Sequence, residues 1–162
     1  MALHDTRLST YLNDHLGGAT GGLELAKRAA GSNAEGDLGP LLERLATDFD
    51  EDRETLREII GALGFKEDAI KKAAGWSAEK VGRLKPNGQL TGYSPLSRLI
   101  ELEGLVIGIT GKRSLWRSLA TVKADDQRLA AFDFAALETR AQAELDDLEP
   151  HRVAAAAGAL RD

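Results

Sequence analysis

Apolar residues recur at intervals of three and four along four long stretches of the chain, the spacing of one face of an α-helix. This pattern predicts helices over about 6–30, 38–63, 94–119 and 133–157. The second and third are separated by residues 65–93, which carry turn signals and one short predicted helix over about 67–81. We therefore expect a short link between the first and second helices, a long link between the second and third, and a short link between the third and fourth.

Residues at the predicted helix ends support these bounds. Asp37 can cap the second helix, Ser94 followed by proline suits the start of the third, and Gly64 is a natural stop. The third helix is apolar almost all round, so we expect it to be the most buried. The alanine-rich end over 153–160 is expected to fray.

Composition favours one helical domain spanning residues 1–162. Hydrophobic residues make up 43% of the chain and aromatic residues only 5%, which suits an aliphatic core. The absence of cysteine excludes disulfides, thiolate metal sites and cysteine nucleophiles. No stretch approaches the roughly 20 apolar residues of a membrane span, so we expect a cytoplasmic protein without membrane contact. The fold class predicted is all-α, an antiparallel four-helix bundle.

The charge distribution bears on possible partners. A net charge of -5 argues against nucleic acid, because phosphate contacts need a basic surface. The link between helices two and three is nevertheless basic. It offers a candidate partner-binding surface, and the competing interpretation is an ordinary solvated helix face. The residues of this candidate surface are Lys71, Lys72, Trp76, Lys80 and Arg83.

One long crossover between the second and third helices distinguishes some bundles from simple up-and-down ones. Together with the stretches 11–15 (Tyr-Leu-Asn-Asp-His), 50–53 (Asp-Glu-Asp-Arg) and 101–105 (Glu-Leu-Glu-Gly-Leu), this layout resembles the ferritin-like superfamily over nearly the whole chain. The resemblance implies a crossover over about 65–93 that makes the second and third helices parallel.

The resemblance also implies a di-iron centre, which requires a Glu-x-x-His motif on each of two helices. This chain contains no such motif, because none of its three histidines follows a glutamate by three positions. A standard di-iron centre is therefore disfavoured, and oxidase or iron-storage activity cannot be transferred from the superfamily.

Polar residues interrupt the apolar face of each predicted helix. They are His15, Asp52, Glu103 and Glu144. With a rise of about 1.5 Å per residue, His15, Asp52 and Glu144 fall at similar heights in such a bundle and Glu103 about ten ångströms away. These four residues are the candidate site.

Three interpretations of this inward polar set stay open, because buried charges need partners. The first is a structural network in which His15 and Arg53, Lys112 or Arg140 neutralise the carboxylates. The second is that the apolar faces are wider than the spacing predicts and the polar residues are partly exposed. The third is a nonstandard site of one imidazole and two or three carboxylates for iron, manganese or zinc.

Small residues are unusually frequent in two of the helices. Glycine lowers helix stability, so its repeated use favours close backbone approach between helices, with a ligand groove or a dimer seam as alternatives. The two tryptophans, Trp76 and Trp116, are interpreted as packing residues. The glycines concerned are Gly17, Gly18, Gly21 and Gly22 in the first helix and Gly104, Gly108 and Gly111 in the third.

The functional prediction is a non-enzymatic bundle that acts by self-association or protein binding. The alternative is a degenerate metal-binding domain or metal-dependent oxidase using the candidate site. No residue is predicted to be catalytic, since the sequence holds no Ser-His-Asp arrangement, phosphate loop or dinucleotide fingerprint.

Overall fold

The computed structural model describes residues 3–67 and 93–161. They form four long helices, α1 (Asp5–Ser32), α2 (Leu38–Ala62), α4 (Pro95–Val122) and α5 (Phe134–Ala159), with the short 3-10 helices η1 (Lys123–Asp125) and η2 (Gln127–Leu129) before α5. The described parts contain no strand, and the prediction of an all-α fold is confirmed. The short helix predicted over about 67–81 and the basic candidate surface lie outside the described residues, apart from Glu67.

Helix ends follow most of the predicted signals. The side chains of Ser94 and Asp133 each accept a hydrogen bond of 3.0 Å from the backbone N–H three residues on, as N-caps do. The predicted capping by Asp37 is wrong, because its backbone is already helical and its side chain makes no cap hydrogen bond. Gly64 adopts φ +74°, a left-handed conformation typical of the residue after a helix end.

The last helix is longer than expected. The backbone of α5 stays helical to Ala159, so the predicted fraying over 153–160 is wrong. Alanine is the best helix former, and Ala155 also packs against the core. Pro150 lies inside the helix without ending it.

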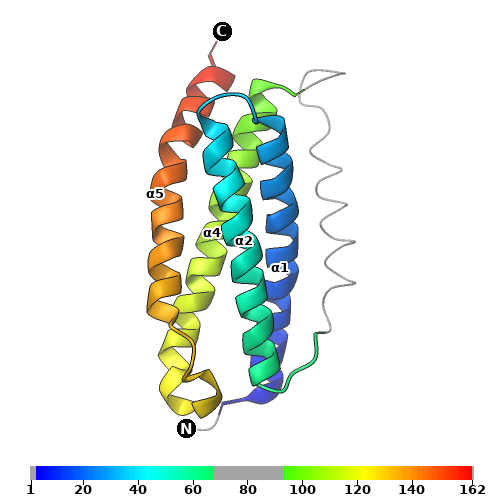
Figure 1. Ribbon diagram of the computed structural model, residues 1–162, viewed down its shortest axis with the longest axis vertical. Coiled ribbons are helices and arrows are strands. Elements are labelled where there is room, and N and C mark those ends of the chain that lie inside the picture. Colours follow the sequence, from blue (N-terminus) through cyan, green and yellow to red (C-terminus); the bar gives the residue numbers. More distant parts are fainter. Residues whose placement is uncertain (1–2, 68–92, 162) are drawn as a thin grey trace.

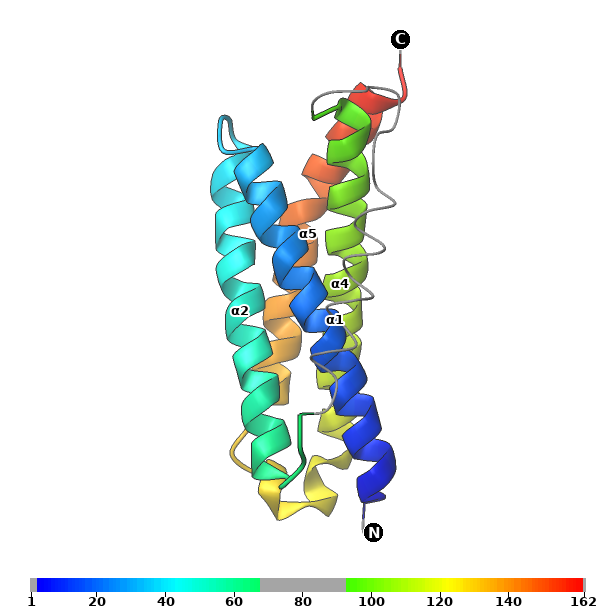
Figure 2. The same cartoon turned by 90° about the vertical axis from the view of Figure 1, so that its right-hand side faces the viewer.

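The four helices run side by side (Figures 1 and 2). In Figure 1 α1 rises from the N-terminal end, α2 returns beside it, α4 runs in the same direction as α2, and α5 rises again. Both α2 and α4 contact α1, and α5 contacts α4 closely and α2 only sparsely. The end of α2 and the start of α4 therefore lie at opposite ends of the molecule.

The hydrophobic core is divided into two clusters along the helices. One contains Phe49 of α2 and Ile109 of α4, and the other contains Leu56 of α2 and Leu115 of α4. Asp52 of α2 and Lys112 of α4 fall between these two levels.

Candidate functional site

A group of four charged side chains occupies the junction between the two core clusters. Lys112 Nζ donates a 2.6 Å hydrogen bond to Asp52 Oδ2 and lies 2.5 Å from Glu144 Oε2. Arg140 pairs with the other oxygen of Asp52 and, at 2.9 Å, with Glu51. We call Asp52, Lys112, Arg140 and Glu144 the central ionic cluster. Its two positive and two negative charges balance.

The cluster is buried because of where the helices place its members. Asp52 lies between Phe49 and Leu56 on the inner face of α2 and is 5% exposed, and Glu144 of α5 is 3% exposed. Lys112 of α4 extends between these helices, with Nζ 4.4 Å from the centre of the Phe49 ring. A buried charge requires such partners, since an isolated one is strongly disfavoured in an apolar interior.

The structural-network interpretation is confirmed for Lys112 and Arg140, which neutralise the carboxylates. Arg53 does not join them, because its guanidinium pairs with Asp50 at 2.8 Å and Glu54 at 3.0 Å on the surface of α2. Successive residues of a helix are related by a rotation of about 100°, so the Arg53 side chain leaves α2 in a different direction from that of Asp52.

Burial raises the pKa of the Glu144 carboxyl above its usual value, and the Lys112 ammonium offsets only part of the shift. Folded Glu144 therefore holds its proton at pH values where the unfolded chain has released it. The contribution of Glu144 to the free energy of unfolding therefore falls as the pH rises from the usual pKa of 4.5 to the raised one.

Glu144→Gln removes this titration while keeping the side-chain shape. We expect the free energy of unfolding of the variant, minus that of wild type, to increase with pH above 4.5 and then to level off. Urea unfolding at a series of pH values measures the difference. A difference that stays constant over the series contradicts the pKa direction.

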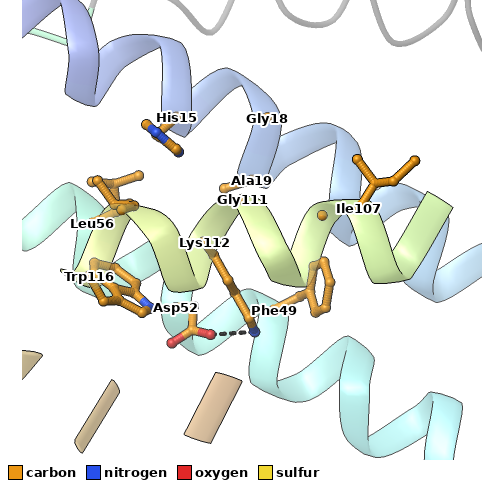
Figure 3. A pocket seen from close by; sticks show the side chains of 12 residues that line it. His15, Gly18, Ala19, Phe49, Asp52, Leu56, Ile107, Gly111, Lys112 and Trp116 are labelled. Atoms are coloured by element: carbon orange, nitrogen blue, oxygen red, sulfur yellow. Dashed lines mark hydrogen bonds and ion pairs between the residues drawn. The ribbon is translucent and has the colours of Figure 1, made fainter. Parts of the chain in front are cut away.

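A cavity of about 220 Å³ lies beside the cluster, between α1, α2 and α4 (Figure 3). Gly18 and Gly111 widen it, because a Cβ at either position would meet nothing within 4 Å. Ile107, which lies at its edge, is 73% exposed, so the expectation that this apolar helix is the most buried fails on that face. The lining residues are His15, Gly18, Ala19, Phe49, Asp52, Leu56, Ile107, Gly108, Gly111, Lys112, Leu115 and Trp116.

Other glycines provide the close packing that their spacing predicted. A Cβ at Gly22 would come within 2.8 Å of Phe49, and one at Gly104 within 2.8 Å of Leu25. Trp116 is 1% exposed, which confirms its interpretation as a packing residue, whereas Trp76 lies outside the described residues. Gly22 and Gly104 thus permit close packing between helices, whereas Gly18 and Gly111 leave room for the cavity.

His15 lines this cavity together with Asp52, but within the described residues no ion pair joins the two. Its ring makes an edge contact with Tyr11, with centroids 4.6 Å apart. Burial lowers the pKa of the imidazole, and Asp14 opposes that shift. The buried carboxylates pair with Lys112 and Arg140 and not with His15, so the predicted neutralisation by His15 is wrong.

Glu103 does not face inward, and that prediction is wrong. Its side chain is 50% exposed and lies 3.8 Å from Arg152. The buried glutamate of α4 is Glu101, two positions earlier, with a side chain only 8% exposed. A shift of two residues rotates a helix position by about 200°, which places the two glutamates on opposite faces.

Glu101 organises a second polar network that the sequence analysis missed. Its carboxylate accepts 2.8 Å hydrogen bonds from Arg28 Nε of α1 and from the Tyr93 hydroxyl. That hydroxyl accepts a 2.8 Å bond from Asn33, which in turn accepts one of 2.7 Å from Arg98. Burial raises the pKa of Tyr93 to about 12. The network joins the end of α1 to the start of α4.

The four residues of the predicted site are therefore not brought together. Among the described residues no group of three or more histidine, aspartate or glutamate side chains is placed to hold a metal ion. Lys112 lies where Asp52 and Glu144 approach each other, and its ammonium supplies the positive charge there. The iron, manganese or zinc site stays a prediction without a converging ligand set.

Comparison with known proteins identifies no relative. No protein-family model matches the chain, and no curated protein or solved structure is significantly similar to it. Within the described parts, no helix is both long enough and apolar enough to cross a membrane.

Proposed function

We propose that the chain is a ferritin-like bundle in which residues 65–93 form the crossover. Support comes from the direction of α2 and α4, which run parallel to each other. The last residue of α2 and the first residue of α4 therefore lie at opposite ends of the molecule (Figure 1). A connection between such ends has to traverse the length of the bundle, as one long crossover does.

We propose further that the protein is non-enzymatic and acts by self-association. The observation that carries this is an exposed apolar face at the end of α5, where Val153 is 52% and Leu160 71% exposed. Leu160 is the residue directly after α5 and lies seven positions from Val153, which is close to two helical turns, so the two fall on about the same side of the bundle. Exposed apolar side chains that share one face are typical of association surfaces.

The charged residues near the centre support the non-enzymatic part. Asp52, Lys112 and Arg140 are engaged with one another, so none of the three is available as a general acid or base without breaking an ion pair. The basic candidate surface with Lys71 and Trp76, outside the described residues, stays a proposed contact region for a protein partner.

A double variant, Val153→Glu with Leu160→Glu, tests the self-association. Wild type should form a concentration-dependent dimer, and the variant should remain monomeric because charge cannot be buried in the contact. Light scattering over a concentration series measures the molar mass.

The matched control is Ala135→Glu with Ala136→Glu, which adds the same charge at two exposed positions at the other end of α5. It should dimerise like wild type. A monomeric wild type at the highest soluble concentration contradicts the proposal, as does equal dimerisation of the Val153 and Leu160 variant.

A further inference from the structure

One side of α1 is covered although it faces away from the bundle core. Asn13 and Gly17 are buried, and Gly21 continues the same side one turn further on. Gly17 is nevertheless turned by about 140° from Leu12 and about 120° from Leu23, two core positions of α1. In Figure 2 α1 lies in front of the other described helices. We call Asn13, Gly17 and Gly21 the outer face of α1.

The chain leaves and re-enters the described structure beside this helix. After α2, the Lys66 carbonyl accepts a 3.1 Å hydrogen bond from Asn13 Nδ2. Before α4, the Tyr93 hydroxyl accepts a 2.8 Å hydrogen bond from Asn33, the residue that follows α1. The direct path for residues 68–92 between these two points therefore runs along α1.

The length of this segment suits that path. Asn13 and Asn33 are separated by about 30 Å along the helix axis, at about 1.5 Å per residue. A helix over the predicted 67–81 covers about 22 Å, and the following residues, each spanning up to about 3.3 Å, cover the rest. Residues 68–92 are thus long enough to contact α1 along the whole path.

The predicted helix over 67–81 has one side that complements the outer face. Ile70 and Val81 lie about three turns apart on that side, and small residues stand between them. Small side chains opposite glycine permit close approach of two helices. The opposite side of the predicted helix carries Lys72 and Trp76. The small residues are Ala73, Ala74 and Ser77.

The charges of the two surfaces are also complementary. Residues 68–92 contain five basic and two acidic side chains. Asp14 and Glu24, which flank the outer face of α1, are both exposed. Such exposed charges contribute little energy individually, but their sign favours a basic segment at this position.

We propose that residues 68–92 dock lengthwise on the outer face of α1, with the apolar side of the predicted helix over 67–81 against Gly17 and Gly21. Lys72 and Trp76 then point to solvent, where a protein partner can contact them. The inference rests on the proposed crossover and does not depend on self-association through α5.

Trypsin digestion of the full chain tests the docking, because residues 68–92 contain lysine and arginine. Gly17→Leu with Gly21→Leu obstructs the outer face and should speed cleavage in this segment at least about 10-fold, a loss of about 1.4 kcal/mol or more in docking free energy. The matched control is Gly18→Leu with Gly31→Leu, since a Cβ at either position meets nothing within 4 Å. The control should be cleaved like wild type, and circular dichroism verifies that both variants stay helical.

A disulfide tests the contact directly, since the chain has no cysteine. Because the segment starts beside Asn13 and runs parallel to α1, Ala74 should lie opposite Gly21. Gly21→Cys with Ala74→Cys should therefore oxidise to an intramolecular disulfide, which requires Cβ atoms about 3.5–4.5 Å apart. Gly21→Cys with Lys72→Cys, on the opposite side of the predicted helix, should stay reduced.

Cleavage of wild type as rapid as that of the Gly17 and Gly21 variant overturns the proposal, and so does equal disulfide formation in the two cysteine pairs. A disulfide between two chains, visible as a dimer on a denaturing gel, would assign the outer face to a second copy instead. Spin labels on Gly61→Cys and Glu103→Cys test the crossover by itself, because they lie near opposite ends of the bundle only if α2 and α4 run parallel. A failed docking is thereby distinguished from a wrong crossover, and light scattering reads self-association separately.

Discussion

Replacing Lys112 with methionine is expected to lower the free energy of unfolding by about 3–5 kcal/mol, because it removes one partner of a buried ion pair. The variant leaves Asp52 and Glu144 buried near each other with only Arg140 to compensate them. Methionine retains most of the aliphatic volume, so the loss reports the charge and not a cavity. Urea unfolding followed by circular dichroism measures it.

The loss should be partly recovered at acidic pH, where the carboxylates accept protons. It should also be largely recovered at neutral pH by adding Asp52→Asn and Glu144→Gln, because a buried charge is costly mainly when it lacks its partner. Arg117→Met is the control, since Arg117 pairs with Glu138 on the surface of the bundle and should contribute only about 0–1 kcal/mol. Equal effects of Lys112→Met and Arg117→Met would show that the central ionic cluster does not stabilise the fold.

The second large effect is expected at Glu101. Glu101→Gln should cost about 1.5–3 kcal/mol, because it replaces a charged acceptor of two hydrogen bonds with a neutral group that can accept only through its single oxygen. The two donors, Arg28 Nε and the Tyr93 hydroxyl, both lie 2.8 Å from the carboxylate. The same denaturant titration measures the change.

Glu103→Gln is a matched control two residues away on the same helix. Its side chain is half exposed, and the expected change is within about 0.5 kcal/mol. If Glu103→Gln destabilised the protein more than Glu101→Gln, the assignment of the buried glutamate would be wrong. The two variants therefore test which side of α4 faces the interior: the side of Glu103, as predicted from sequence, or the side of Glu101, as observed.

The inner face of a helix could be predicted from sequence only where that helix is clearly amphipathic. In α2 the buried positions Leu45, Phe49 and Leu56 follow a clear three-and-four spacing, and Asp52 falls within it, so its burial could be predicted. In α4 apolar residues occur almost all round, and the pattern did not indicate which glutamate lies inside. Ile107 looked like a core residue and is largely exposed.

Partners of the buried charges were harder to predict than the charges themselves. The sequence offers Arg53, Lys112 and Arg140 as possible partners of the buried carboxylates, and nothing in their local sequence separates them. The decision depends on which helices are adjacent and at what height. Asp52, Lys112 and Arg140 come from three different helices, far apart in the chain.

By itself the sequence determined the all-α class, the approximate bounds of the four long helices, and the presence of an ionisable group on the inner face of α2. These properties depend on local propensity and on periodicity about a helix's own axis. Only the tertiary structure decided that Glu101 and not Glu103 is buried, that Lys112 joins Asp52 to Glu144, and that a cavity remains beside Trp116. The rotation and relative height of neighbouring helices set those contacts, and both arise from packing between residues that are distant in the sequence.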